Sequence, residues 1–185
     1  MRDDRSRRGR WGLTLAAMGL VAACADPLDT PIANADMQEM ESDYVTFGMV
    51  SFLTTRGVRE GRISADTAYM FEDSASAHLR GMEIVFYDED GRERATVTGT
   101  TGQWSWDTDR MVARGDVVLI VHSDGSKLES QEIYYDPDLD RIWSDSATVQ
   151  TFADGTVTSG SSFESDMSFE NILIRDPRGG SRRIF

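Results

Sequence analysis

Residues 81–91 read GMEIVFYDEDG and residues 115–125 read GDVVLIVHSDG, so a Gly, an apolar run and an Asp-Gly pair occur twice in the same order. A third Asp-Gly pair stands at 154–155, and the three pairs lie 34 and 30 residues apart. Asp-Gly between alternating runs is typical of a type I′ hairpin, because both central residues need positive φ. The repeat therefore predicts a long antiparallel meander built from one strand-and-turn unit.

The β pattern begins at Tyr44 and continues to Arg175, and no segment shows a sustained helical period. We therefore predict an all-β chain with one domain over 44–175 and a flexible tail over 176–185. The expected strands are 44–54, 58–64, 67–72, 78–88, 93–99, 102–106, 110–114, 117–122, 127–135, 140–144, 147–152, 156–164 and 168–175.

The first 23 residues have the features of a signal peptide. A basic start precedes an uncharged stretch, Trp11 to Ala23, which is shorter than the roughly 20 apolar residues of a membrane span. The stretch ends in Val-Ala-Ala-Cys24 and resembles a bacterial lipobox, in which the only cysteine would carry the lipid. We predict a lipoprotein signal peptide over 1–23, and a lipidated Cys24 with a polar tether over 24–43. The alternatives are a plain secretory signal with an incidental cysteine, and a twin-arginine signal.

The charge balance limits the partners of the chain. The whole chain has a formal net charge of −13, and loss of a leader with five Arg and two Asp leaves −16. Such an acidic surface repels phosphate backbones and anionic head groups. The balance argues against a nucleic-acid-binding role and against a broad basic platform for lipid phosphates.

Alternation indicates which residues share one face of a strand. The residues expected to point inward are Val85, Tyr87, Val117, Leu119, Val121 and Val149. The first unit is the least clear, because Met82, Ile84 and Phe86 form an apolar face of their own. The inward residues either fill a sandwich core or line a ligand groove, and the pattern alone favours the core.

Trp104 and Trp106 are two residues apart, so both rings point to the same side of a strand. Such a pair buries a large apolar area, and each indole N–H needs a partner. The pair either lines a groove for acyl chains or closes the end of a core, and its spacing fits both.

Motifs for catalysis are missing from the sequence. His78 and His122 lie 44 residues apart, without a metal-ligand spacing. Asp136, Asp138 and Asp140 alternate, but they lack the Gly and closing Glu of an EF-hand loop and fit an acidic turn. No nucleophile elbow or phosphate-binding glycine loop occurs. We therefore predict that the chain is not an enzyme and uses no metal and no cofactor.

Four short motifs follow one another along the predicted domain. They are Leu79-x-Gly81-x5-Tyr87-Asp88-x-Asp90-Gly91, then Trp106-Asp107 with Gly115-x-Val117-x-Leu119, then Leu128 and Ser130 before Ile133-x-Tyr135-Asp136, and last Ser159-Gly160-x2-Phe163. In their order and spacing, residues 63–174 resemble the LptC family of periplasmic lipopolysaccharide-export proteins, with LptA-type OstA-like domains as relatives.

The resemblance implies a twisted, open antiparallel jellyroll whose interior is a hydrophobic groove for the acyl chains of lipid A. It also implies that the protein takes lipopolysaccharide from an inner-membrane ABC transporter and passes it to an LptA-like bridge protein. The groove would be lined by Val85, Tyr87, Trp104, Trp106, Val117, Leu119, Val121, Tyr135 and Val149.

In such a family, strand addition at the first and last strands would join neighbouring proteins. The edge residues expected to meet partners are Tyr44, Phe47 and Met49 on the transporter side, and Phe169, Ile172 and Ile174 on the bridge side.

The anchor departs from the family pattern, because typical members use a transmembrane helix where this chain has Cys24. We expect a periplasmic protein that is lipid-anchored to the inner membrane, with the outer membrane as an alternative. The alternative function is an envelope β lipoprotein that acts as a scaffold or general binding module. The two functions differ in whether the interior is an open groove or a filled core. A secreted hydrolase would need a nucleophile or acid/base pair that the sequence does not suggest.

Overall fold

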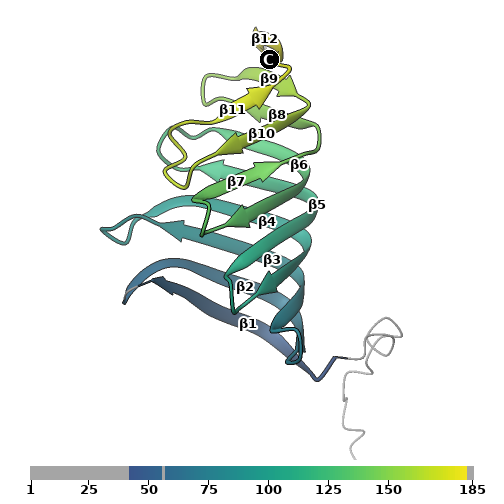
Figure 1. Ribbon diagram of the computed structural model, residues 1–185. Coiled ribbons are helices and arrows are strands. Elements are labelled where there is room, and N and C mark those ends of the chain that lie inside the picture. The colour runs from purple at the N-terminus through teal and green to yellow at the C-terminus, as the bar shows by residue number, and fades with distance from the viewer. Residues whose placement is uncertain (1–41, 56, 183–185) are drawn as a thin grey trace, which may run out of the picture.

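The computed structural model describes residues 42–55 and 57–182, and every regular element in this part of the chain is a β-strand. The strands are β1 (Tyr44–Thr55), β2 (Val58–Phe71), β3 (Ser76–Tyr87), β4 (Glu93–Ser105), β5 (Arg110–Val121), β6 (Lys127–Asp136), β7 (Arg141–Ser144), β8 (Thr148–Thr151), β9 (Thr156–Gly160), β10 (Ser162–Ser165), β11 (Leu173–Arg175) and β12 (Arg178–Arg182). The predicted all-β class is confirmed (Figure 1). Among the described residues, no helix that could cross a membrane is found. The predicted signal peptide and Cys24 lie outside these residues.

All twelve strands belong to one antiparallel sheet that divides at β6. Residues 134–136 of β6 pair with β7, whereas residues 127–129 pair with β8. One branch continues through β7 and β10 to β11, and the other continues through β8 and β9 to β12. We call these branches, with the strand halves that lead to them, the first layer and the second layer.

The long strands belong to both layers, because they bend near their middle. In β3, residues 76–80 lie in the first layer and residues 82–86 in the second, with Gly81 between them at φ +58°. Gly48 in β1 and Gly115 in β5 take the same left-handed conformation, at φ +60° and +77°. Glycine adopts this conformation without a steric penalty, so each strand turns a corner without ending. Figure 1 shows the strands curving around the right-hand side of the molecule.

These bends correct three predicted strand breaks. The separate strands expected at 58–64 and 67–72, at 93–99 and 102–106, and at 110–114 and 117–122 are the continuous β2, β4 and β5. In β4 and β5 the predicted break coincides with an irregularity inside the strand, whereas β2 keeps its register with β3. The register shifts between Thr98 and Thr101 on β4, opposite Arg114 and Val117 on β5, show this irregularity directly.

Gly81→Ala is expected to lower the free energy of unfolding by about 2 kcal/mol, because the left-handed backbone is strained for alanine. In addition, a Cβ at this position would lie 2.2 Å from Oδ2 of Asp66, which must move. Gly91→Ala is the matched control, since Gly91 has φ +80° and no atom within 4 Å of its Cβ position. Its free energy of unfolding, measured with urea, should fall by about 1 kcal/mol. Equal losses in the two variants would show that the bend has room for a side chain.

The Asp-Gly turns are wider than the predicted type I′ hairpins. Gly91, Gly125 and Gly155 have φ between +69° and +83°, but the preceding aspartates are not among the described residues with positive φ. The amide of Gly91 donates to the carbonyl of Asp88, and that of Gly155 to the carbonyl of Phe152, each at 2.9 Å. Each of these loops ends on one left-handed glycine. The side chains of Asp124 and Asp154 accept hydrogen bonds from the backbone amides of Ser126 and Thr156.

The hairpin turns form two rims. The first-layer rim consists of the turns 72–75, 106–109 and 137–140, whereas the second-layer rim consists of the turns 88–92, 122–126 and 152–155. Both rims lie at the strand ends that are away from the bends. The two layers therefore have a mouth along one side, and the bends close the other side.

The C-terminal strands differ from the prediction. The expected strand 156–164 is divided into β9 and β10, which belong to different layers, and the expected strand 168–175 is reduced to β11. A Cβ at Gly160 would lie 2.3 Å from the carbonyl oxygen of Arg175, so only glycine fits at this division. The expected flexible tail instead contains β12, which pairs with β9.

Candidate functional site

Apolar side chains from both layers fill the space between them. In the second layer, Ile84 pairs with Val97, which pairs with Leu119, and Leu119 pairs with Leu128. These four side chains are at most 2% exposed. The buried apolar residues that the first layer adds are Ala68, Ala77, Leu79, Trp104, Met111, Ala113, Ile133, Tyr135, Ile142 and Phe163. The interior is therefore one continuous apolar zone across many strands.

Most of the side chains predicted to line a groove lie in this interior. They are Trp104, Trp106, Val117, Leu119, Val121 and Tyr135, of which Trp106 is the one that is only partly buried. Val117, Leu119 and Val121 have no exposed surface, so protein atoms shield them from solvent. That these side chains contact a lipid stays a prediction.

The predicted inward position of Val85 is wrong. Ile84 and Phe86 belong to the interior, so Val85 between them lies on the other face of β3, where it is buried as well. Cross-strand register determines this choice, because Ile84 must share a face with Val97. Sequence alternation could not identify the inner face, since both faces of this strand half are apolar. Tyr87 follows a register shift and lines a cleft together with Phe86 and Tyr135, so its place in a lipid groove stays a prediction.

The inward position predicted for Val149 is also wrong, because its side chain is 37% exposed. Its neighbours Thr148 and Gln150 are 0% and 5% exposed, and Gln150 pairs with the inner residue Leu128. Hydrogen bonds allow polar groups in this part, where the hydroxyls of Ser130 and Ser144 lie 2.8 Å apart. The interior therefore becomes more polar toward β8.

The two tryptophans lie at the β1 end of the interior. A hollow of about 560 Å³ is lined there by Met49, Met70, Trp104 and Trp106 with their neighbours. The two indole rings meet edge to face with their centroids 6.2 Å apart, and Nε1 of Trp104 donates to Asp109 at 3.4 Å. The interior is therefore accessible at this end through an apolar opening.

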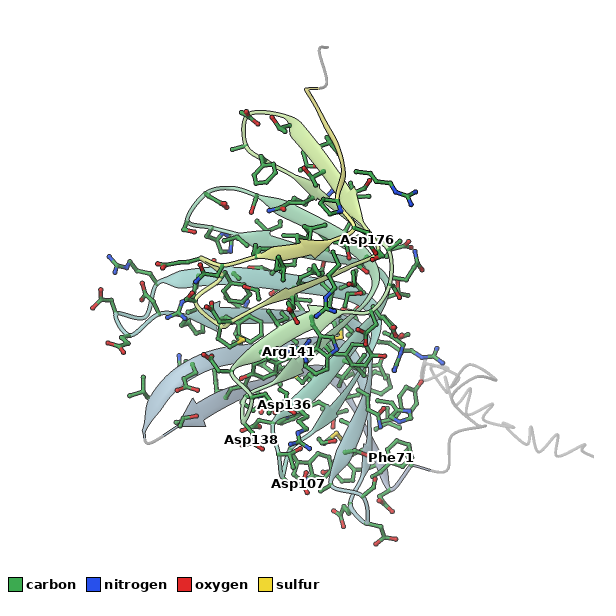
Figure 2. The ribbon with its side chains drawn as sticks, turned by 45° about the horizontal axis from the view of Figure 1, so that its top comes forward. Phe71, Asp107, Asp136, Asp138, Arg141 and Asp176 are labelled. Atoms are coloured by element: carbon green, nitrogen blue, oxygen red, sulfur yellow. The ribbon has the colours of Figure 1, made fainter. Side chains whose placement is uncertain are left out.

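A second opening lies in the mouth between the two rims. It is a cleft of about 600 Å³ in which Phe86 and Tyr135 are lining residues. Carboxylates from both rims surround it, and Figure 2 shows Asp107 and Asp138 on neighbouring turns of the first-layer rim. Burial raises the pKa of the Tyr135 phenol, and the charges of nearby carboxylates raise it further, so the phenol stays neutral. The mouth has acidic rims around an aromatic floor.

The segment 166–172, between β10 and β11, lies against this mouth. Phe169 is 3% exposed, and its ring centroid lies 5.8 Å from that of Phe86 on the other layer. The predicted role of Phe169 at a partner edge is therefore wrong, because its side chain is buried in the interior. Ile172 and Ile174 are partly buried against the same interior. Asp166 and Ser168 were the local sequence sign of a turn in this segment, since the side chains of Asp and Ser readily form hydrogen bonds with nearby backbone groups.

The sheet has edges at both ends. β1 pairs only with β2, and its exposed apolar side chains include Tyr44, Phe47 and Val50 at 47%, 66% and 56% exposure. Met49 was predicted at this edge, but it turns inward and is 8% exposed. At the opposite end, β11 and β12 are the last strands of the two layers.

The histidines and the acidic turn have structural partners. The ring of His78 lies 4.9 Å from that of Phe71, and Nε2 of His122 lies 2.9 Å from the hydroxyl of Thr96. The carboxylate of Asp136 accepts the amide of Asp138 at 3.0 Å and pairs with Nε of Arg110 at 2.9 Å. Within the part of the chain that the structure describes, no group of His, Cys, Asp and Glu is arranged to hold a metal ion.

Comparisons with known proteins give matches of two kinds, a family model and solved structures. A family model described as "Lipopolysaccharide-assembly, LptC-related" matches residues 12–174. A similar solved structure is LptH from Pseudomonas aeruginosa, described as the LptA-homologous periplasmic component of the conserved lipopolysaccharide transport device. It has a TM-score of 0.50 and 16% sequence identity, over 62% of this chain and 80% of that chain. No curated protein sequence matches the chain significantly.

Proposed function

Since the chain belongs to the LptC-related family of lipopolysaccharide-assembly proteins, we propose that it is a membrane-anchored periplasmic component of lipopolysaccharide export. It would take lipopolysaccharide from an inner-membrane ABC transporter and pass it along its interior to the next bridge protein. The family and the LptA-like fold support a role in lipopolysaccharide transport. The transfer steps and the partners are the proposal.

The observation that carries the proposal is the apolar zone between two layers that continuous strands join at the bends. Each buried methylene is worth about 0.8 kcal/mol, so acyl chains cannot cross an aqueous space unprotected. A mouth along one side would let the chains slide inside while the sugars stay in water. This transport needs no catalysis by the chain itself, and the energy would come from ATP hydrolysis by the transporter.

Lipid entry requires the two layers to separate, because side chains such as Leu119 leave no free space around them. The architecture favours such a movement. The layers are continuous at the bends, whereas the mouth already contains the cleft and the β1 end contains the apolar hollow. We therefore propose that the acyl chains replace contacts between the layers as they enter.

The sheet edges are the proposed partner surfaces. The exposed apolar side chains of β1 suit strand addition by the transporter, and β11 at the other end suits the bridge protein. Ile174 lies within β11, and Ile172 precedes this strand. Phe169 has no part in this surface, because it is buried.

The anchor is a further part of the proposal. A lipid on Cys24 would hold the chain on the periplasmic face of the inner membrane, and the polar residues up to 43 would let the domain extend from it. Anchoring in the outer membrane is the alternative, because Ala25 rather than Asp follows the cysteine.

The second candidate function is a scaffold or general binding module of the envelope. The fully buried state of Val117, Leu119 and Val121 favours it, since a filled core is all that a scaffold needs. The two functions differ in whether lipid ever reaches the interior.

Photo-crosslinking in cells tests this difference. A photoreactive phenylalanine derivative at Trp106 or Leu119 is expected to capture lipopolysaccharide, because both positions face the interior. Position 120 is the matched control, since Ile120 is adjacent to Leu119 and 40% exposed on the other face. Trp106 is the safer site, because an aromatic residue of similar size replaces it. Equal capture at all three positions, or none, would remove the support for transport and leave the scaffold.

A further inference from the structure

The segment 166–172 extends from the first layer into the mouth. It begins and ends on the first layer, where β10 and β11 pair. The backbone carbonyl of Met167 accepts a hydrogen bond from Nη1 of Arg94, on the second layer, at 2.6 Å. The amide of Met167 donates to Oδ1 of Asp140, on the first-layer rim, at 3.4 Å. These two contacts attach one residue of the segment to both layers.

Phe169 is the part of the segment that enters the interior. Its ring packs on Phe86, whose ring also lies 5.2 Å from Tyr135, so three aromatic side chains meet at the mouth. Phe86, Tyr135 and Met167 also line the cleft of about 600 Å³. The cleft therefore ends where the segment begins to fill the space between the layers.

The segment is a strained turn that its own side chains organise. Phe169 has φ +59°, a conformation that bulky residues rarely adopt and that persists only where the surroundings impose it. Asp166 organises the turn, because it accepts bonds from the amide and hydroxyl of Ser168 and from the side chain of Asn171. The flanking strands β10 and β11 have only four and three residues. A short turn with one strained aromatic residue can leave its place without unfolding the sheet.

We propose that residues 166–172 are a displaceable stopper, in which the ring of Phe169 occupies the place of an acyl chain and leaves when lipid enters. The inference rests on the proposed function, because it names the contact that entering lipid must break. A phenyl ring and an acyl chain compete for the same apolar surface on Phe86. The stopper keeps the apolar interior dry when no lipid is bound, and it lowers the apparent affinity of the protein for lipid.

Binding of a fluorescently labelled lipopolysaccharide to the mature protein tests the stopper. Phe169→Ala removes the ring, and Arg94→Gln removes the bond to Met167 without touching the apolar interior. The apparent Kd of Phe169→Ala should fall about tenfold, as expected when the competent open state is about 10% populated. Arg94→Gln should change the apparent Kd in the same direction. Phe152→Ala is the matched control, since Phe152 is 37% exposed on a turn of the second-layer rim, and its Kd should not change.

Unchanged or weaker binding in Phe169→Ala and Arg94→Gln would overturn the stopper, because the ring would then be part of the groove wall or irrelevant to it. A thermal melt shows whether Phe169→Ala is folded. If Phe169→Ala is not folded, the apparent Kd of Arg94→Gln tests the stopper alone, because the Arg94 side chain lies outside the apolar interior and its replacement leaves the core intact.

Hydrogen exchange separates a failure of the stopper from a failure of the proposed function. The amides of Met167 and Phe169 have acceptors in the empty protein, so lipopolysaccharide should speed their exchange. If lipopolysaccharide binds and these amides stay protected, the stopper is wrong and the transport proposal stands. If neither the wild type nor either variant binds lipopolysaccharide, the proposed function fails and the stopper fails with it.

Discussion

Leu119→Ala is expected to lower the free energy of unfolding by about 3 kcal/mol, because the change leaves a cavity in a closely packed interior. Leu119 has no exposed surface and pairs with Val97 on one side and Leu128 on the other. Urea unfolding of the mature protein, with tryptophan fluorescence as the signal, measures the change. The slope of the free energy of unfolding against urea concentration should stay the same, since the surface exposed on unfolding is nearly unchanged.

Ile120→Ala is the control for this variant, because it removes a similar side chain from the next position of the same strand. Ile120 is 40% exposed, so the loss should stay below about 1 kcal/mol. A loss below 1 kcal/mol for Leu119→Ala as well would mean that the layers are already apart at this point. The result therefore also reports whether the groove is closed in the absence of lipid.

A double substitution on β1, Phe47→Asp with Val50→Asp, is expected to weaken transporter binding about 30-fold. This factor corresponds to the loss of one hot-spot contact of ~2 kcal/mol. Both side chains are more than half exposed, so the domain should stay folded. Charges along an edge oppose the approach of another strand, which is how natural edge strands avoid pairing. Co-purification of the transporter permeases with the lipid-anchored protein from detergent extracts measures the loss.

Leu139→Asp is the matched control for the edge variant. Leu139 is 61% exposed but belongs to the turn 137–140 and not to the β1 edge, so transporter binding should persist. If the β1 variant retains full binding while its melting temperature is unchanged, strand addition at this edge is excluded as the contact. The edges β11 and β12 would then be examined with the same kind of substitution.

Several features of the site had clear sequence signals. Val117, Leu119 and Val121 form a wholly apolar face of β5, whereas the other face also contains Asp116 and His122, and the spacing of Trp104 and Trp106 places both rings on one side. Period-two alternation is a local property, so it survives in the folded sheet wherever one face is much more apolar than the other. Alternation therefore predicted the inner residues of β5 and of the end of β4.

Other features depended on contacts between distant residues. Val85 and Ile84 are equally apolar, and only the register with Val97 shows that Ile84 faces inward. Val149 is more apolar than Gln150, yet Gln150 is the buried one because it pairs with Leu128. Phe169 was expected at an edge, but a turn organised by Asp166 directs its ring into the interior.

The amino-acid order alone thus specified an antiparallel all-β chain and the places of its hairpin turns, because these depend on residues that are close together in the chain. Folding in three dimensions selected which face of each strand is inner, how β6 pairs with both β7 and β8, and which segment fills the mouth. The reason is physical: a strand has two faces and two edges, and only the partners that reach it from elsewhere in the chain determine which of these are buried.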